Sequence, residues 1–137
     1  MRPSRLTVKK RFTFEAAHHL PNHKGKCRTV HGHSYVLYVV LRDSDAYESF
    51  SKRKNYIEQG FLIDFSDLKF LVKELIIDKF DHKDLNDFFP IPSAEEVARY
   101  CFITISEAML SNSKFDLVIL EKVILYETED SCVEWSL

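Results

Sequence analysis

Three histidines of this chain have the type and spacing of a metal-binding site. His31 and His33 are separated by one residue, so on a β-strand their side chains point to the same face with Cα atoms about 7 Å apart. His18 closes an earlier run of alternating apolar residues, and a hairpin would bring it beside them. Three imidazole ligands that leave a fourth position open are typical of catalytic zinc, whereas structural zinc has four protein ligands. The pattern therefore predicts a metal site that performs chemistry.

Cys27 lies four residues before His31, in the basic segment Lys24-Gly25-Lys26-Cys27-Arg28. Positive charge and a nearby metal ion favour the thiolate, which can remove a proton from a substrate or attack it. The same side chain can instead become a fourth metal ligand, which would give a closed site of three histidines and one cysteine. Spacing alone is compatible with both roles.

Two further positions carry groups suited to proton transfer or ligand binding. Asp81 and His82 are adjacent, and a carboxylate that fixes the tautomer of an imidazole makes the ring a general acid or base near neutral pH. Taken alone, such a dipeptide is more often a solvated turn. Glu127 follows the apolar run 124–126, where a buried carboxylate needs a cation, an amide-like edge or water as its partner. The alternative is that Glu127 is an exposed strand end.

The other histidines and cysteines are expected to have no role in catalysis. On a strand His19 points away from His18, and we expect His19 and His23 to be surface or loop residues. Cys101 and Cys132 are expected in the core or at a sheet edge. The three cysteines are odd in number and include no Cys-x-x-Cys pair, which is typical of a reducing compartment.

The composition indicates one globular domain, residues 1–137. Of the 137 residues, 45% are hydrophobic and 29% are charged, unlike disordered, collagen-like or membrane sequences. The net charge of −2 gives no general attraction to nucleic acid or to a membrane surface, so neither is an expected partner. The apolar runs are too short for a membrane span or a secretory signal, and we expect a cytoplasmic protein. In a domain this small, a subunit interface is expected to supply part of an enclosed site.

Alternating apolar residues predict the strands that position the histidines. The four predicted strands cover 6–18, 31–41, 115–128 and 131–135. The polar stretch 43–59 is expected to be an extended connection.

Two helices are predicted between the second and third strands. Ser66 is expected to cap a helix whose apolar face covers 68–76, and Ser93 with Glu96 forms a capping box before a helix over 94–108. The predicted fold is α+β, in the order ββααββ, with a four-stranded antiparallel sheet and two helices on one face. Its open sheet edges favour oligomerisation.

Together these motifs resemble the 6-pyruvoyltetrahydropterin synthase family, and more closely its bacterial branch, the 6-carboxytetrahydropterin synthases of queuosine biosynthesis. The resemblance covers nearly the whole chain, in family order and at similar spacing. It is carried by Phe14-Glu15-Ala16-Ala17-His18, Cys27 with His31-Gly32-His33-Ser34, Asp64-Phe65, Asp81-His82 with Leu85-Asn86, Pro92-Ser93-Ala94-Glu95, and Glu127-Thr128.

The resemblance implies a role for each candidate residue. His18, His31 and His33 would bind Zn²⁺, and Cys27 would be the base that removes a proton. Asp81 and His82 would form a second proton-transfer unit. Glu127 would anchor the pterin ring of the substrate through paired hydrogen bonds.

The resemblance also implies the fold and the assembly. The family has the tunnelling fold (T-fold), in which three subunits close a barrel and two trimers stack into a homohexamer. Its active sites lie between subunits, so Cys27 and the Asp81-His82 pair of one site would come from different chains.

The implied activity converts 7,8-dihydroneopterin triphosphate to 6-carboxy-5,6,7,8-tetrahydropterin, with release of acetaldehyde and triphosphate. The alternative within the family is 6-pyruvoyltetrahydropterin synthase of the tetrahydrobiopterin pathway, which eliminates triphosphate but keeps the carbon side chain. Two non-enzymatic alternatives are a pterin-binding T-fold protein and a structural zinc site with four protein ligands. The presence of Cys27, Asp81 and His82 argues against a binding protein without catalysis.

Three features depart from the usual family pattern. Ser93 stands where threonine is common, His19 stands where arginine is common, and the 43–59 connection is longer than in compact bacterial members. Serine keeps the capping role. The other two changes bear on the contacts of the triphosphate, for which the candidates are Lys24, Lys26 and Arg28.

Overall fold

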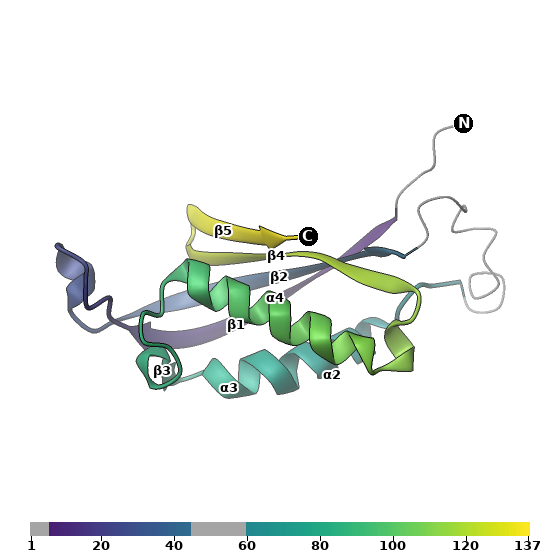
Figure 1. The fold of residues 1–137 in the computed structure, drawn as a ribbon, viewed down its shortest axis with the longest axis horizontal. Coiled ribbons are helices and arrows are strands. Elements are labelled where there is room, and N and C mark those ends of the chain that lie inside the picture. The colour runs from purple at the N-terminus through teal and green to yellow at the C-terminus, as the bar shows by residue number, and fades with distance from the viewer. Residues whose placement is uncertain (1–5, 45–59) are drawn as a thin grey trace.

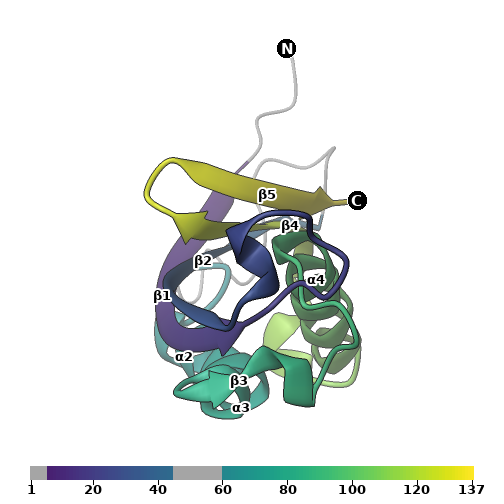
Figure 2. The ribbon, with the colours of Figure 1, turned by 90° about the vertical axis from the view of Figure 1, so that its left-hand side faces the viewer.

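The computed structural model describes residues 6–44 and 60–137. The predicted connection over 43–59 therefore lies mostly outside the described residues. Within them, five strands form one sheet in the order β3-β1-β2-β4-β5, and the helices lie against one face of it (Figure 1, Figure 2). The predicted α+β class is confirmed, and the sheet has one strand more than predicted.

The first two strands form the hairpin that carries the three histidines. β1 spans Thr7–His18 and β2 spans His31–Asp43. Their antiparallel register pairs His18 with His31, and Ala16 with His33, so the three imidazoles share one face at one end of the hairpin. The same face continues into the core, with buried side chains at alternate positions: Phe12, Phe14, Tyr35, Leu37, Val39 and Leu41.

The last two strands extend the sheet beyond β2. β4 (Val118–Thr128) pairs antiparallel with β2, and β5 (Ser131–Ser136) pairs antiparallel with β4. β4 begins three residues later than predicted, because Ser113–Phe115 form a 3-10 turn before it. The register between β4 and β5 shifts from Tyr126 to Thr128, so Glu127 lies in a β-bulge.

The first predicted helix is a continuous helical segment over 65–80. It comprises α2 (Phe65–Val72), a π-helical stretch (Lys73–Ile77) and α3 (Asp78–Phe80). The prediction of Ser66 as the N-cap is wrong, since the Asp64 carboxylate accepts a hydrogen bond from the Ser66 N–H at 2.8 Å. A carboxylate also interacts favourably with the positive end of the helix dipole. Buried residues recur every four positions along this segment: Leu68, Val72, Ile76 and Phe80.

α4 (Ala94–Leu110) is the second predicted helix. Ser93 is its N-cap, as predicted, and its hydroxyl accepts a hydrogen bond from the Glu96 N–H at 3.2 Å. Cys101 lies on its buried face, where burial raises the pKa of the thiol to about 12. Among residues 6–44 and 60–137, no helix combines the length and the apolar character needed to cross a lipid bilayer.

The prediction of a four-stranded antiparallel sheet is wrong in one respect. Lys83 and Asp84 form a fifth strand, β3 (Lys83–Asp84), which pairs parallel with Ala16 and Ala17 of β1. A strand of two residues is too short to show an alternating apolar pattern. A 3-10 turn, Leu85–Asp87, follows it. β3 brings the Asp81-His82 dipeptide to the edge of β1.

The N-cap of α4 provides a test of the fold. Ser93→Ala should lower the free energy of unfolding by about 1 kcal/mol, because the Glu96 N–H loses its acceptor. Ser93→Thr keeps the hydroxyl and should lose much less. Urea unfolding at one fixed protein concentration measures both variants.

Ser111→Ala, at the other end of α4, is the matched control. Ser111 is exposed and its hydroxyl lies 3.4 Å from the Ala108 carbonyl oxygen, so the expected loss is below about 0.5 kcal/mol. Equal losses in Ser93→Ala and Ser111→Ala would show that the cap contributes nothing to stability.

Candidate metal centre

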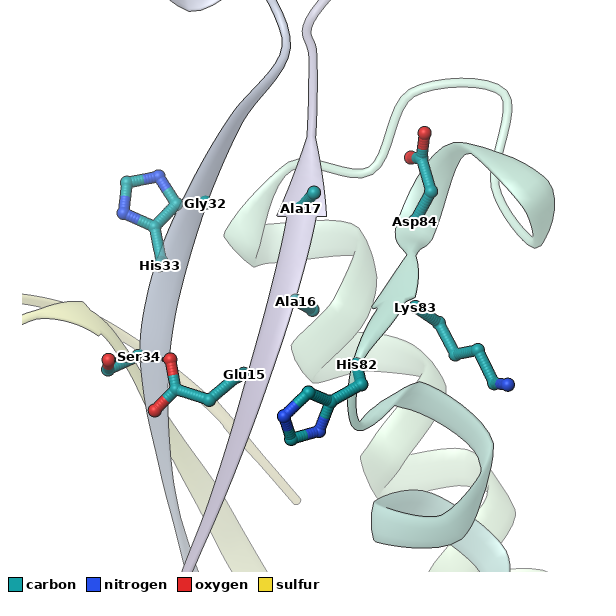
Figure 3. A pocket seen from close by; sticks show the side chains of 9 residues that line it. All are labelled: Glu15, Ala16, Ala17, Gly32, His33, Ser34, His82, Lys83 and Asp84. Atoms are coloured by element: carbon teal, nitrogen blue, oxygen red, sulfur yellow. Dashed lines mark hydrogen bonds between the residues drawn. The ribbon is translucent and has the colours of Figure 1, made fainter.

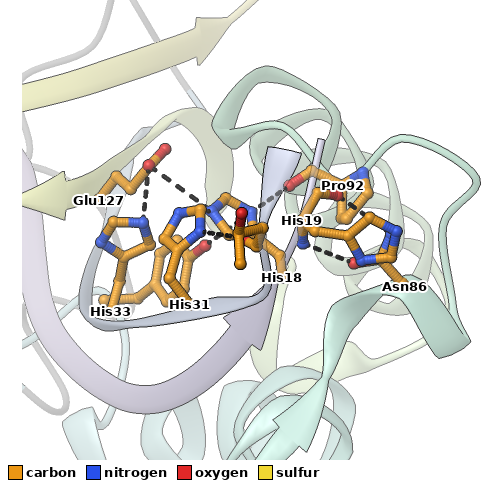
Figure 4. Close-up of polar contacts among 9 residues, drawn as sticks. His18, His19, His31, His33, Asn86, Pro92 and Glu127 are labelled. Atoms are coloured by element: carbon orange, nitrogen blue, oxygen red, sulfur yellow. Dashed lines mark hydrogen bonds and ion pairs between the residues drawn. The ribbon is translucent and has the colours of Figure 1, made fainter. Parts of the chain in front are cut away.

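Four side chains gather at one end of the β1–β2 hairpin. His18 ends β1, His31 and His33 begin β2, and Glu127 lies near the end of β4 (Figure 4). One potential ligand atom of each lies within 4.8 Å of the others. His18 is fully buried and the other three are partly buried. The structure thus brings the three predicted histidines together and adds a carboxylate to them.

Backbone carbonyls fix the orientation of two of the imidazoles. His18 Nδ1 lies 2.8 Å from the Pro92 carbonyl oxygen, and His31 Nδ1 lies 2.7 Å from that of Thr29. A carbonyl oxygen only accepts, so each Nδ1 carries a proton, and the neutral tautomer that fits this contact has the lone pair of Nε2 at the centre. These two Nε2 atoms are 3.1 Å apart. Two lone pairs at this distance repel unless a cation contacts both, so the donor set fits a metal ion.

His33 supplies a third nitrogen to the cluster. Its Nε2 is buried and has no hydrogen-bond partner among the described residues, and the Glu127 oxygen Oε1 lies 2.9 Å away. Burial is the main reason that the pKa of His33 is lowered; Glu127 opposes this effect, and His18 and His31 add to it. A lowered pKa keeps the ring neutral at pH 7, so its lone pair is available to a metal ion.

The Glu127 carboxylate faces the histidines. Its Oε1 atom also lies 3.7 Å from His18 Nε2, and its side chain is 26% exposed. The residue reaches this place from the β-bulge between β4 and β5, a feature that often redirects a side chain next to a functional site. Glu127 can therefore act as a fourth ligand or contact a molecule bound beside the metal.

The ring of Tyr35 lies against the rings of His18 and His33, on the buried side of the cluster. Its ring is fully buried, stacks on Phe14 with centroids 4.9 Å apart, and places its hydroxyl 3.4 Å from His18 Nδ1. Burial raises the pKa of its phenol, so the group stays neutral. The alternating pattern already puts Tyr35 on the same face of the strand as His31 and His33, but sequence reasoning assigned it no role at the site.

Cys27 lies apart from this cluster. It is half-buried in a 3-10 turn, Lys26–Arg28, which belongs to the connection between β1 and β2. The Leu20 N–H donates to the Cys27 carbonyl oxygen at 2.8 Å and so closes this connection. Among the described residues, the thiol is not one of the ligand atoms that lie within 4.8 Å of one another. The alternative of a closed site with Cys27 as a ligand has no support in the geometry of a single chain.

Asp81 and His82 lie at the other edge of β1. His82 Nδ1 is 3.1 Å from Asp81 Oδ2, and Asp81 Oδ1 accepts a hydrogen bond from the Glu15 N–H at 2.9 Å. The Glu15 hydrogen bond is the main reason that the pKa of Asp81 is lowered; partial burial opposes it, and the contact with His82 adds to it. The His82 side chain is 79% exposed. The pair is thus an imidazole oriented by an ionised carboxylate and accessible to a second molecule.

An open hollow of about 480 Å³ adjoins the His82 ring (Figure 3). Its lining includes His33 and His82, together with Glu15 and Ser34. Ala17 and Gly32 leave room in the hollow because their side chains are small or absent.

His19 lies in the loop directly after β1, in agreement with its prediction as a surface or loop residue. It is half-buried, and its Nδ1 atom is buried without a hydrogen-bond partner among the described residues. The side chain of Asn86 lies against the backbone of His19 and forms two hydrogen bonds with it. His23 is exposed, as predicted. Sequence reasoning assigned no role to Asn86 or to Pro92, because contacts between a side chain and a distant backbone group leave no periodic pattern.

The chain is similar to known proteins over nearly its whole length. The family described as 6-pyruvoyl tetrahydropterin synthase matches residues 7–136. The 6-carboxy-5,6,7,8-tetrahydropterin synthase of Haemophilus influenzae is 36% identical, over 69% of this chain and 78% of its own length. The protein of the same name from Synechocystis sp. is 39% identical, over 74% of this chain and 75% of its own length.

A solved structure agrees with these relatives. The Caenorhabditis elegans 6-pyruvoyl tetrahydropterin synthase superposes with a TM-score of 0.76 at 27% identity, over 100% of this chain and 99% of its own. With this fold, the histidine cluster and the family match over 7–136, the chain belongs to the 6-pyruvoyl tetrahydropterin synthase family.

Proposed function

We propose that this chain converts 7,8-dihydroneopterin triphosphate and water to 6-carboxy-5,6,7,8-tetrahydropterin, acetaldehyde and triphosphate. The observation that carries the proposal is the cluster of three imidazoles and one carboxylate within 4.8 Å, in a chain of this family. The 36–39% identity with proteins named 6-carboxy-5,6,7,8-tetrahydropterin synthase favours this branch, since the C. elegans 6-pyruvoyl enzyme is 27% identical.

The proposed metal is Zn²⁺, held by His18, His31 and His33. Three neutral imidazoles suit zinc, and a position left for water or substrate is typical of its catalytic sites. When bound, the ion would act as a Lewis acid on hydroxyl and carbonyl oxygens of the substrate side chain. The carbonyls of Pro92 and Thr29 support this assignment, because they hold two rings in the tautomer that ligates through Nε2.

Proton transfer is assigned to two groups. The Cys27 thiolate would remove a proton from the substrate side chain, since its turn also carries Lys26 and Arg28. The second group is His82, oriented by Asp81. The ionised Asp81 carboxylate would stabilise the imidazolium that forms when His82 accepts a proton.

Glu127 would bind the pterin ring. A carboxylate can accept two parallel hydrogen bonds from the N–H groups of an aminopyrimidine edge. Its proximity to His33 supports this role, because a pterin held there would have its side chain beside the metal. If Glu127 is a zinc ligand, its mutation should weaken Zn²⁺ binding. If Glu127 is a substrate anchor, its mutation should lower kcat/KM instead, so the two roles can be separated.

The proposed assembly is a homohexamer of two trimers with active sites between subunits, in the cytoplasm, with residues 1–137 as one domain. β5 is an edge strand of the sheet and carries Trp135, which is 39% exposed, so this edge offers apolar surface to a neighbouring subunit. Cys27 does not line the hollow beside His82, which supports a site completed by a second chain. The proposed pathway is queuosine biosynthesis.

The second candidate function is that of a 6-pyruvoyltetrahydropterin synthase. The match to the C. elegans enzyme over the full chain favours it. The two reactions differ in the fate of the carbon side chain, so the products decide between them.

Product analysis tests the proposed reaction directly. The zinc-loaded protein, incubated with 7,8-dihydroneopterin triphosphate, should release acetaldehyde and 6-carboxytetrahydropterin in equal amounts, with one triphosphate per turnover. Chromatography with mass detection, and trapping of the aldehyde, would follow all three products. A stoichiometric yield of the 6-pyruvoyl product without acetaldehyde would refute the carboxy branch.

Glu127→Gln tests the anchoring role. The amide keeps the shape but cannot accept two hydrogen bonds in parallel, so kcat/KM should fall about 10- to 100-fold while Zn²⁺ affinity stays within about threefold. His31→Ala is the comparison, because loss of a proposed ligand should greatly weaken Zn²⁺ binding. If Glu127→Gln weakens Zn²⁺ binding as much as His31→Ala does, Glu127 is a ligand and not an anchor.

Mixed assemblies test whether each site is shared. Cys27→Ala and His82→Ala should each lower turnover by about 10²- to 10⁴-fold. Hexamers reassembled from both variants should regain part of the activity, because some sites then receive an intact Cys27 and an intact His82. Mixing Cys27→Ala with the Cys27→Ala/His82→Ala double variant is the control and should regain none. No recovery in the first mixture would mean that one chain supplies both residues.

A further inference from the structure

The segment from Asp81 to Asn86 lies along the end of β1. Its contacts follow β1 residue by residue. The His82 N–H donates to the Glu15 carbonyl oxygen at 2.6 Å, while the Glu15 N–H donates to Asp81. β3 then pairs with the next two residues of β1.

Asn86 continues this ladder past the end of β3. Its Oδ1 accepts a hydrogen bond from the His19 N–H at 2.9 Å, and its Nδ2 donates to the His19 carbonyl oxygen at 3.1 Å (Figure 4). One side-chain amide thus satisfies both backbone groups of a residue 67 positions away. A primary amide has the adjacent acceptor and donor that this contact needs.

The amide of Asn86 is itself held in place. The backbone N–H of Asn86 donates to Asp84 Oδ1 at 2.9 Å, and the preceding residue, Leu85, is fully buried. The side chain is half-buried between the 3-10 turn and β1. Asn86 is therefore a fixed support for His19, not a mobile surface group.

His19, which forms the two hydrogen bonds with Asn86, directly follows His18. The His18 imidazole is held at its Nδ1 end by Pro92, and its Nε2 faces His31. The Pro92 contact sets the ring, and pairing with His31 holds the His18 backbone from the side of β2. What holds the chain directly after His18 is the contact of His19 with Asn86. The chain leaves β1 at His19, and the side chain of Asn86 holds both backbone polar groups of this residue.

We propose that Asn86 is a positioning residue for His18, and that it sets the geometry and affinity of the metal centre without touching the metal. The proposal rests on the assignment of His18 as a ligand in the proposed function. Outer partners of metal ligands typically change metal affinity by about 10- to 100-fold when they are removed. We expect a change in metal affinity of this size when the two hydrogen bonds between Asn86 and His19 are lost.

Zinc affinity of matched variants tests the proposal. Asn86→Ala removes both hydrogen bonds, and Asn86→Asp keeps the acceptor for the His19 N–H while it loses the donor to the carbonyl oxygen. Both should weaken Zn²⁺ binding about 10- to 100-fold in competition with a chromophoric chelator. The absorption spectrum of bound Co²⁺ should also change, since it reports the ligand geometry. If Asn86→Ala does not fold, the Zn²⁺ affinity and the Co²⁺ spectrum of Asn86→Asp still test the proposal.

Asn112→Ala is the matched control. Asn112 also uses its Oδ1 to accept a backbone N–H, that of Lys114 at 3.1 Å, and it caps a 3-10 turn. It lies beyond the far end of α4, a helix of 17 residues and thus about 25 Å long. Asn112→Ala should lose stability with unchanged Zn²⁺ affinity and an unchanged Co²⁺ spectrum.

Two results separate this proposal from the proposed function. If the Asn86 variants match the wild type in Zn²⁺ affinity and Co²⁺ spectrum, the side chain is only structural and the inference is wrong. If the wild type binds Zn²⁺ but forms no acetaldehyde, the proposed reaction is wrong, and the affinity ratio between the Asn86 variants and the wild type still decides the role of Asn86.

Discussion

The candidate site depends on two imidazole nitrogens that face each other with their lone pairs. His18 Nε2 and His31 Nε2 lie 3.1 Å apart because a backbone carbonyl accepts the Nδ1 proton of each ring. Neither carbonyl belongs to a strand: Pro92 precedes α4, and Thr29 precedes β2. A bound cation would relieve the repulsion between the lone pairs, and it would do so where the ends of the hairpin meet the start of α4. Metal binding and local stability are therefore linked.

The register of the β1–β2 hairpin decides whether this arrangement can exist. A slip of one residue would turn the histidines of one strand to the opposite face of the sheet. Phe14 and Tyr35 oppose such a slip, since they pair across the hairpin and are buried on the same face as His18. Burial of one such side chain stabilises the native register by about 1.5–3 kcal/mol. The hydrophobic pattern that folds the hairpin therefore also aligns His18, His31 and His33 on one face.

The same strand parity explains which features the sequence could predict. Alternation tells which face of a strand each side chain lies on, so the grouping of His18 with His31 and His33 follows from this alternation and a hairpin. The N-cap Ser93 could be predicted for a similar reason, since the capping box is a local pattern. β3 could not be predicted, because a strand of two residues shows no alternating pattern. The sequence could not decide between Asp64 and Ser66 as the N-cap of α2, since both side chains can cap a helix. The contacts of Asn86 and Pro92 join a side chain to a backbone group 67 and 74 residues away, which no local pattern records.

His82 shows why the two halves of the proposed site are not independent. Its φ of 60° lies in the left-handed region, which costs a non-glycine residue about 1–2 kcal/mol and persists only where the surroundings enforce it. Here the His82 N–H and the Asp81 carboxylate both bind the backbone of Glu15. The turn that exposes the His82 ring also starts the ladder that ends at Asn86, beside His18. A chain that kept every motif residue but changed this segment would place these side chains differently, because one stretch of backbone positions both the proposed proton-transfer pair and a proposed metal ligand.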